Sequence, residues 1–232
     1  MPASRIEARP PKGRLSASIA RDPAIVDGFL RDAAHFPGGH ADGVARPASE
    51  AEVAALLTTC SPILIAGAQS SLTGGATPHG GIVISTSKLD GIERVDSDEV
   101  RVGAGVSLET LQASLDEWGG WFPPVPTFMG ATTGGVVATN AAGAATFRYG
   151  TTRAWVDGLT AVMTCGCVLD IARDETCADP HFEISCAHGI RTIVPGTYRM
   201  PDVPKVSAGY FAAPGMDLID LFIGSEGTLA VV

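Results

Sequence analysis

The chain has 232 residues, a formal net charge of −9, 45% hydrophobic residues, 18% charged residues and 28 glycines. This length and composition fit a globular protein with one large domain or two small ones. The acidic balance argues against nucleic acid or an anionic membrane surface as the main partner, because both attract clustered Lys and Arg. The sequence contains no run of about 18 apolar residues and therefore predicts no membrane span.

The first 20 residues combine basic side chains with prolines and lack the apolar stretch of a signal peptide. We therefore expect residues 1–20 to be a disordered lead-in. A cytoplasmic location is the corresponding expectation for the protein.

The five cysteines are an odd number in a chain too large to need disulfides, which favours reduced thiols. Cys165 and Cys167 flank Gly166 at the tip of a predicted hairpin, while Cys177 and Cys186 lie near two histidines. These spacings match no common zinc pattern. The sequence therefore predicts free thiols and no metal site.

Capping residues and apolar runs outline the first half of the chain. A helix is expected over residues 23–35. Ser49, followed three residues later by Glu52, forms a capping box and predicts a second helix. Ser107 caps a third helix, which Gly119 ends. Short apolar runs predict four strands, at residues 63–66, 82–85, 92–95 and 100–103.

Prolines and small residues open the second half. Residues 122–126 contain three prolines and must be extended, and a small-residue segment follows as far as Gly143. Beyond it we expect a hairpin at 156–171, an irregular stretch at 173–214, a short helix at 217–222 and a strand at 228–232. The pattern is mixed α and β, in two halves that divide near residue 105.

The loop from Gly67 to Gly75 lies between two predicted strands and is rich in small residues. Its backbone N–H groups can converge on the phosphates of a dinucleotide, and Ser70, Ser71 and Thr73 offer hydroxyl donors. It lacks both the Gly-Lys-Ser/Thr of a P-loop and the spacing of a Rossmann loop. On this segment alone, a wide glycine-rich hairpin loop is an equal alternative.

Two further segments of small residues favour a cofactor. Thr132 to Gly135, continued by Asn140 to Gly143, would let the backbone lie against a planar group, and Gly224 to Leu229 forms a third such segment. Tight packing through Gly and Ala is the alternative explanation. Three such segments are hard to explain by packing alone.

The order of these segments resembles the FAD-linked oxidase family, which has the PCMH-type flavin fold of vanillyl-alcohol oxidase. That family includes D-lactate dehydrogenases, the flavin subunit of glycolate oxidase and D-2-hydroxyglutarate dehydrogenases. The resemblance covers about Val44 to Val232, and its most specific parts are residues 71–76, 133–143, 149–150, 205–210 and 224–229.

The resemblance implies an α+β fold, a two-lobed PCMH-type FAD-binding domain. A small βαβ-type lobe at residues 21–105, with the pyrophosphate loop at 66–75, would precede a larger lobe at 106–232 that has a mixed or antiparallel sheet and helices. In the family a C-terminal substrate domain follows, and we expect that domain to be absent from this chain.

The resemblance also implies which residues contact FAD. The first segment would wrap the pyrophosphate, the middle segment would run along the cofactor to the flavin, and the last would close the adenine and pyrophosphate side. Gln69 stands where the family usually has a glycine, which leaves the local backbone angles open and adds an amide donor. The candidate contacts are Ala66, Gly67, Ala68, Gln69, Ser70, Ser71, Leu72, Pro124, Thr127, Gly130, Thr132, Gly134, Gly135, Thr139, Asn140, Ala141, Gly143, Glu226, Gly227 and Val232.

The chemistry implied is hydride transfer from a small-molecule substrate, a 2-hydroxy acid or a similar alcohol, to FAD. Some relatives attach the flavin to a loop histidine, but none lies between Gly67 and Gly75, so we expect non-covalent FAD. A base near neutral pH would normally be a histidine. None of the five histidines lies in a motif, so no catalytic residue is assigned; Arg148 and Tyr149 are candidates only for facing the flavin.

Three alternatives stay open. The chain could be a flavin-binding subunit or module that works only with a partner chain. It could be related to the flavin subunit of molybdenum hydroxylases, although Tyr149-Gly150 and Gly224 to Gly227 favour the FAD-linked oxidases. Finally, it could be a flavin-free carbohydrate-binding or protein-binding domain, if the glycine clusters are only turns.

Overall fold

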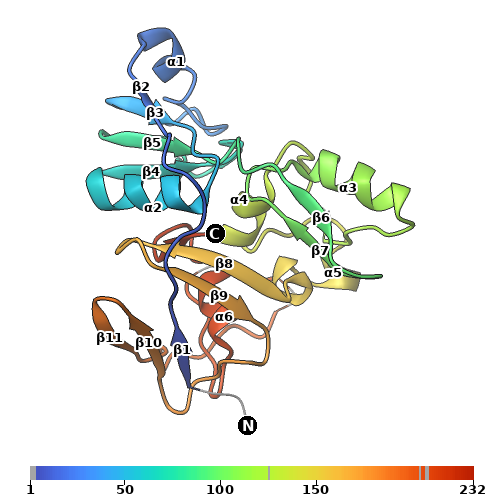
Figure 1. Cartoon of the computed structure of the whole chain (residues 1–232). Coiled ribbons are helices and arrows are strands. Elements are labelled where there is room, and N and C mark those ends of the chain that lie inside the picture. Colours follow the sequence, from blue (N-terminus) through green and yellow to red (C-terminus); the bar gives the residue numbers. More distant parts are fainter. Residues whose placement is uncertain (1–3, 125, 204, 207–208) are drawn as a thin grey trace. The chain divides into compact units, whose positions relative to one another are not determined.

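The fold is described from a computed structural model of the chain, shown in Figure 1, which covers residues 4–124, 126–203, 205–206 and 209–232. Val125, Ser207 and Ala208 of the segments discussed above lie outside the described residues. The chain divides into two compact units. The N-terminal unit comprises residues 12–122 and 127–135, and the C-terminal unit comprises residues 1–11, 123–126 and 136–232.

The N-terminal unit is built on a four-stranded sheet with the order β2-β3-β5-β4 (Figure 1). Its strands are β2 (Ile19–Ala20), β3 (Gly43–Ala45), β4 (Ile63–Ala66) and β5 (Ile82–Ser85). β3 and β4 both run parallel to β5, whereas β2 is antiparallel to β3. Parallel strands are normally buried on both faces, and this explains why β4 and β5 are continuous apolar runs.

Two helices cover the faces of this sheet. On one face, Val26 of α1 (Pro23–Asp27) packs against Val44 and Val83. On the other, Leu56 of α2 (Glu50–Thr59) packs against Ile82 and Ile84. α1 is shorter than the helix expected over 23–35, because the residues after it use their backbone to hold the loop that follows β4: the N–H of Ala33 donates to the carbonyl of Gln69 at 3.0 Å.

The start of α2 confirms that Ser49 caps the helix, but the Glu52 side chain accepts hydrogen bonds from Ala48 and Ser16 and not from the N–H of Ser49 as in a standard capping box. The Ser49 hydroxyl accepts a hydrogen bond from the N–H of Glu52 at 3.3 Å. The Glu52 carboxylate is buried and accepts hydrogen bonds from the N–H of Ala48 at 2.6 Å and from the hydroxyl and N–H of Ser16 at 2.5 and 2.9 Å. Glu52 therefore connects α2 to the segment that precedes β2.

A Glu52→Gln variant should be less stable than the wild type at pH 7, by about 1–2 kcal/mol, because it loses a charged acceptor. The hydrogen bonds from Ser16 and Ala48 lower the pKa of Glu52 in the folded chain, against the opposing effect of burial. A carboxyl group with a lowered pKa stabilises the fold above its ordinary pKa, and this stabilisation is lost as the pH falls through the folded-state pKa. Urea unfolding of both proteins at pH 7 and below about pH 4 measures the difference in free energy of unfolding between the wild type and the variant, which should be smaller at the lower pH. An equal difference at the two pH values would contradict the prediction.

The rest of the N-terminal unit follows the predicted pattern. β6 (Ile92–Arg94) and β7 (Val100–Val102) form an antiparallel pair. α3 (Leu108–Glu117) begins at Ser107, whose hydroxyl accepts a hydrogen bond from the N–H of Thr110 at 3.1 Å. The chain turns away at Gly119, which has a φ of 76° and so serves as the expected helix terminator.

The C-terminal unit has a sheet of the order β12-β8-β9, of which β8 and β9 are labelled in Figure 1. β8 (Gly158–Met163) and β9 (Val168–Ala172) form the predicted hairpin, and β12 (Ala230–Val231) is antiparallel to β8. The core beside this sheet includes Leu169 and the side chains of α6 (Leu218–Phe222). The unit also contains α5 (Thr146–Tyr149) and the 3-10 helix η1 (Thr152–Trp155), while α4 (Thr133–Ala138) crosses the boundary between the units.

Two expectations about this unit were wrong. The stretch expected to be irregular contains a second hairpin, formed by β10 (Phe182–Cys186) and β11 (Gly189–Ile193). The N-terminal segment expected to be disordered contains β1 (Arg5–Glu7), which pairs in parallel with β10. A strand of three residues has no detectable alternation of its own, and its pairing partner lies far away in the sequence.

None of the helices within the described residues has the length and apolar character needed to cross a membrane.

Candidate functional site

The first small-residue segment is the loop that leaves the carboxyl end of β4. Ala66, the last residue of the strand, is fully buried, and the backbone of the following loop is held by the segment after α1. The N–H groups of Ala33 and Ala34 donate to the carbonyls of Gln69 and Ser71 at 3.0 and 3.1 Å. Backbone hydrogen bonds from this segment therefore help to hold the loop in place.

Gln69 determines the shape of this loop. Its φ is 49°, in the left-handed region that glycine adopts most easily, so the backbone here is compatible with the glycine expected from the family resemblance. Its side-chain amide donates to the carbonyls of Phe29 at 2.8 Å and Ala76 at 3.0 Å. The extra amide donor that the sequence offers is thus used within the protein, where it closes the loop.

The N-terminal unit brings the first loop and the start of the middle segment together. A Cβ atom at Gly67 would lie 2.2 Å from the hydroxyl oxygen of Thr132, so any larger residue there would displace the Thr132 side chain. That hydroxyl is buried and has no hydrogen-bond partner among the described residues. A buried unpaired hydroxyl is unusual in a folded protein. A phosphate oxygen of FAD would accept its hydrogen bond, so these residues fit the cofactor.

Backbone hydrogen bonds hold Thr132 and its neighbours in place. The N–H of Leu108, at the start of α3, donates to the carbonyl of Ala131 at 2.9 Å. The N–H of Thr133 donates to the carbonyl of Val106 at 2.8 Å, and its hydroxyl donates to the carbonyl of Gly103 at 2.6 Å. These bonds fix the backbone on both sides of Thr132.

Two adjacent glycines at the start of α4 have different surroundings. A Cβ atom at Gly134 would lie 2.7 Å from the Cβ of Ala104, so packing within the protein explains that glycine. A Cβ atom at Gly135 would meet, among the described residues outside the helix backbone, only the Thr132 hydroxyl, at 3.3 Å. Glycine costs a helix about 1 kcal/mol relative to alanine, and packing does not account for that cost at Gly135.

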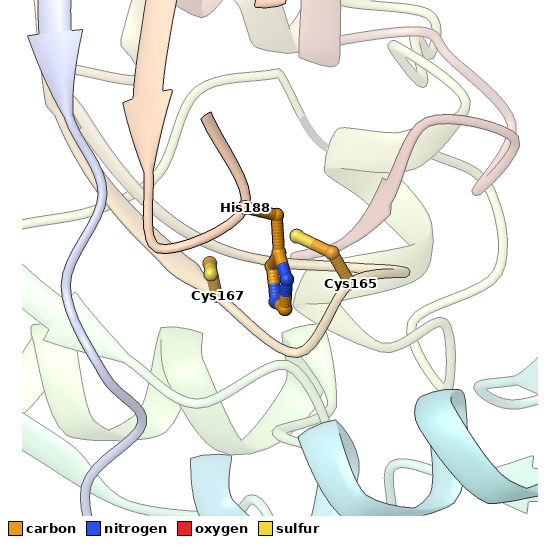
Figure 2. A group of neighbouring side chains, drawn as sticks. All are labelled: Cys165, Cys167 and His188. Carbon is orange, nitrogen blue, oxygen red and sulfur yellow. The ribbon is translucent and has the colours of Figure 1, made fainter. Parts of the chain in front are cut away.

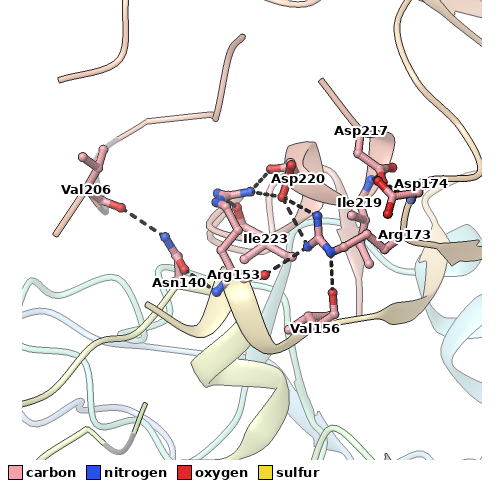
Figure 3. A network of polar contacts seen from close by, with 10 residues as sticks. All are labelled: Asn140, Arg153, Val156, Arg173, Asp174, Val206, Asp217, Ile219, Asp220 and Ile223. Carbon is pink, nitrogen blue, oxygen red and sulfur yellow. Dashed lines mark hydrogen bonds and ion pairs between the residues drawn. The ribbon is translucent and has the colours of Figure 1, made fainter. Parts of the chain in front are cut away.

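The second part of the middle segment belongs to the C-terminal unit, where Asn140 fixes the chain after α4. Asn140 is buried and has a φ of 44°. Its amide nitrogen donates to the carbonyl of Val206 at 3.1 Å, and its amide oxygen accepts a hydrogen bond from the N–H of Arg153 at 3.0 Å (Figure 3). The side chain is therefore used in the framework, which leaves the backbone of this segment as the candidate for contact with a ligand.

The third small-residue segment joins the end of α4 in the same unit. The N–H of Gly224 donates to the carbonyl of Val137 at 3.0 Å, and the N–H of Glu226 donates to the carbonyl of Ala138 at 2.8 Å. A Cβ atom at Gly224 would lie 3.2 Å from the Cβ of Asn140, and its φ is 86°. Glu226 has a φ of 56°, and partial burial raises its pKa.

A network of arginines and one carboxylate supports this arrangement (Figure 3). The Arg153 guanidinium donates to the Asp220 carboxylate at 3.0 Å and to the carbonyls of Asp220 and Ile223, both at 2.6 Å. Arg173 lies 3.4 Å from the same carboxylate and donates to the carbonyls of Val156 and Arg153, both at 3.0 Å. Asp220 is thus the shared acceptor of two arginines, with 13% of its side chain exposed.

The residues considered for facing the flavin contact each other. The Arg148 guanidinium lies 5.1 Å from the centre of the Tyr149 ring, and the indole N–H of Trp155 donates to the Tyr149 carbonyl at 2.9 Å. This geometry gives neither side chain a catalytic role.

Sequence reasoning identified the three segments but missed the residues that brace them. The supports outside the segments include Phe29, Ala33 and Ala34 in the N-terminal unit and Arg153 in the C-terminal unit. Most of them act through backbone groups, which leave no signal in the identity of the residue.

Together, the loop after β4, the buried Thr132 hydroxyl and the glycines of α4 fit the class of proteins that bind a dinucleotide largely through backbone groups. A family described as FAD binding domain matches residues 41–172, more than half of the chain. The chain belongs to this family, and FAD is its cofactor.

Similar proteins agree with this assignment. The D-lactate dehydrogenase of Archaeoglobus fulgidus is 36% identical over 197 residues, which cover 82% of this chain and 36% of that protein. The glycolate oxidase subunit GlcD of Bacillus subtilis is 32% identical over 199 residues, 82% of this chain and 35% of that protein. The chain thus spans about a third of the length of these relatives.

A solved structure shares the fold. The crystal structure of 6-hydroxy-D-nicotine oxidase from Arthrobacter nicotinovorans aligns with a TM-score of 0.61 at 22% identity, over 70% of this chain and 37% of that one. The expected α+β fold of the PCMH type is thereby confirmed.

Proposed function

We propose that the chain is the FAD-binding part of a flavin-dependent oxidoreductase that transfers hydride from a 2-hydroxy acid or a similar alcohol to FAD. The observation that carries this proposal is the similarity, over 82% of the chain, to a D-lactate dehydrogenase and to a glycolate oxidase subunit. Both names refer to oxidation of a small 2-hydroxy acid, so this substrate class is the one we infer.

FAD, when bound, supplies the hydride acceptor, and the chain must position the cofactor. We propose that Gly67 to Leu72 hold the pyrophosphate with backbone N–H groups and that the Thr132 hydroxyl donates to a phosphate oxygen. Gly135 leaves room for the cofactor, and the backbone of Thr139 to Gly143 lies near the flavin. The segment from Glu226 to Val232 contacts the adenine and pyrophosphate side. Because the first loop has no histidine, the cofactor is held without a covalent bond.

A flavin-binding module that needs a partner chain or a further domain is the second candidate. It is favoured by the positions of the histidines within each unit. The rings of His40 and His79 lie 6.2 Å apart, His181 is 3.7 Å from Glu183, and His188 lies beside two cysteines. These contacts do not identify any of these four histidines as the base that accepts the proton of the substrate hydroxyl group.

Reduction of the bound flavin tests whether the chain is catalytic by itself or needs a further domain or partner chain. The FAD-loaded chain is mixed under anaerobic conditions with D-lactate, glycolate or D-2-hydroxyglutarate, and the absorbance of oxidised flavin is followed. We expect no bleaching by the chain alone and full bleaching by dithionite, because the chain holds the cofactor but no assigned base. Rapid bleaching by one of the acids would instead show that the chain is catalytic by itself.

A further inference from the structure

The tips of two hairpins meet in the C-terminal unit and bring together two thiols and an imidazole (Figure 2). Cys165 and Cys167 lie at the turn between β8 and β9, and His188 lies at the turn between β10 and β11. The two sulfur atoms and one ring nitrogen all lie within 4.8 Å of one another. His188 is far from the two cysteines in the sequence, so the spacing of the three residues does not by itself indicate a cluster.

Local geometry explains why the first two side chains converge. The N–H of Gly166 donates to the carbonyl of Met163 at 2.8 Å, and the N–H of Met163 donates to the carbonyl of Cys167 at 2.9 Å. Gly166 has a φ of 82°, which closes the turn. The turn therefore places both thiols on one short stretch of backbone.

The N-terminal segment brings the second hairpin to the first. The N–H of Ala8 donates to the carbonyl of Ser185 in β10 at 2.7 Å, while Arg9 exchanges two backbone hydrogen bonds with Val168 in β9, at 2.8 and 2.9 Å. Because Ala8 and Arg9 are adjacent, the ends of β9 and β10 must lie near each other. His188 follows β10 by two residues and so comes close to Cys167.

This set of donors suits a transition metal. Two thiolates and one imidazole are the ligands that Zn²⁺ prefers, and three protein ligands leave a fourth position for water or another group. On a tetrahedral zinc ion such ligand atoms lie about 3.6–3.8 Å apart, so the cluster would need to contract by at most about 1 Å. Cys167 is buried whereas His188 is exposed, so the imidazole can move and the ion can enter from solvent.

We propose that Cys165, Cys167 and His188 form a binding site for Zn²⁺ or a similar thiophilic divalent ion, which links the tips of the two hairpins. The chain has three further cysteines, Cys60, Cys177 and Cys186, and none of them belongs to the cluster. The proposed site is therefore specific to one pair of turns and is not a general property of the thiols in this protein.

The test is a titration of the whole chain with Zn²⁺, under reducing conditions and in competition with a chelating indicator. We expect one ion per chain. Co²⁺ at the same site should produce thiolate-to-cobalt charge-transfer absorption. Because the ion binds the folded state, Zn²⁺ at about a hundred times its Kd should raise the Tm by about 5–10 °C.

Variants separate this site from adventitious binding. Cys165→Ser and His188→Ala should each weaken Zn²⁺ binding by about tenfold or more, because each removes one of three ligands. Cys60→Ser and His181→Asn are matched controls outside the cluster and should bind Zn²⁺ as the wild type does. His188 is exposed, so its variant should fold normally even if a cysteine variant does not. Two results would overturn the proposal: failure of the wild-type chain, with its thiols reduced, to bind added Zn²⁺, or an affinity for Zn²⁺ in the His188→Ala variant equal to that of the wild type.

Discussion

Replacing Gly135 with leucine is expected to lower the affinity for FAD by about a hundredfold or more while the chain stays folded. A bulky side chain in a closely packed site costs up to about 3 kcal/mol, which corresponds to that factor in Kd. At Gly135 a Cβ atom meets only the Thr132 hydroxyl, at 3.3 Å, among the described residues outside the helix backbone, so a side chain requires a shift of a few tenths of an ångström by that hydroxyl and not by a neighbouring backbone segment. Leucine is also a better helix former than glycine, which should preserve α4.

Two control variants make this prediction specific. Gly134→Ala should destabilise the cofactor-free chain, because its Cβ atom would lie 2.7 Å from the Cβ of Ala104. Gly91→Leu should change neither stability nor FAD affinity, because Gly91 is exposed and a Cβ atom there meets no heavy atom of the described residues within 4 Å. Unchanged FAD affinity in Gly135→Leu would show that the middle segment serves only the packing of the protein.

The second large effect is expected at Asp220. Replacing this residue with alanine should lower the free energy of unfolding by about 3–5 kcal/mol, because two largely buried arginines lose their shared carboxylate. Arg153 and Arg173 expose 18% and 25% of their side chains and lie 3.0 and 3.4 Å from Asp220. Burial also lowers the pKa of Arg153, an effect that Asp220 opposes.

Thermal unfolding of the Asp220→Ala variant measures this effect, with an expected decrease in Tm of about 10 °C. The matched control is Arg5→Ala, which removes an ion pair with Glu183 on the surface, where 52% of the Arg5 side chain is exposed. Exposed pairs contribute little to stability, so this variant should unfold almost as the wild type does. Equal effects of the two variants would contradict the structural role assigned to Asp220.

The elements that could be predicted are those with a local signal. Ser49 and Ser107 cap the helices that the structure shows, and β4 and β5 are apolar runs long enough to recognise. β1 could not be predicted, because its three residues include one apolar side chain and its stability comes from pairing with β10. The role of the residues after α1 could not be predicted either, because their backbone holds a loop about 40 positions away in the sequence. One example is the hydrogen bond that the Gln69 amide donates to the carbonyl of Phe29.

The candidate site was predictable to the level of segments but not of individual roles. Glycine clusters indicate where the backbone approaches another group closely, and they therefore predicted residues 67–75 and 132–143 as candidate segments. The sequence could not show that the amide of Gln69 closes its own loop or that the amide of Asn140 supports Arg153. The proximity of Cys165, Cys167 and His188 could not be predicted, because the strand pairing that brings the two hairpins together is non-local.

Equilibrium titration of the purified whole chain with FAD tests the central claim most directly. Flavin fluorescence and absorbance are followed until saturation, for the wild type and for Gly135→Leu in parallel. We predict one tightly bound FAD per wild-type chain, released on denaturation, and no saturable binding by the variant in the same concentration range. A folded wild-type chain that binds no FAD would contradict the claim that these backbone segments hold the cofactor.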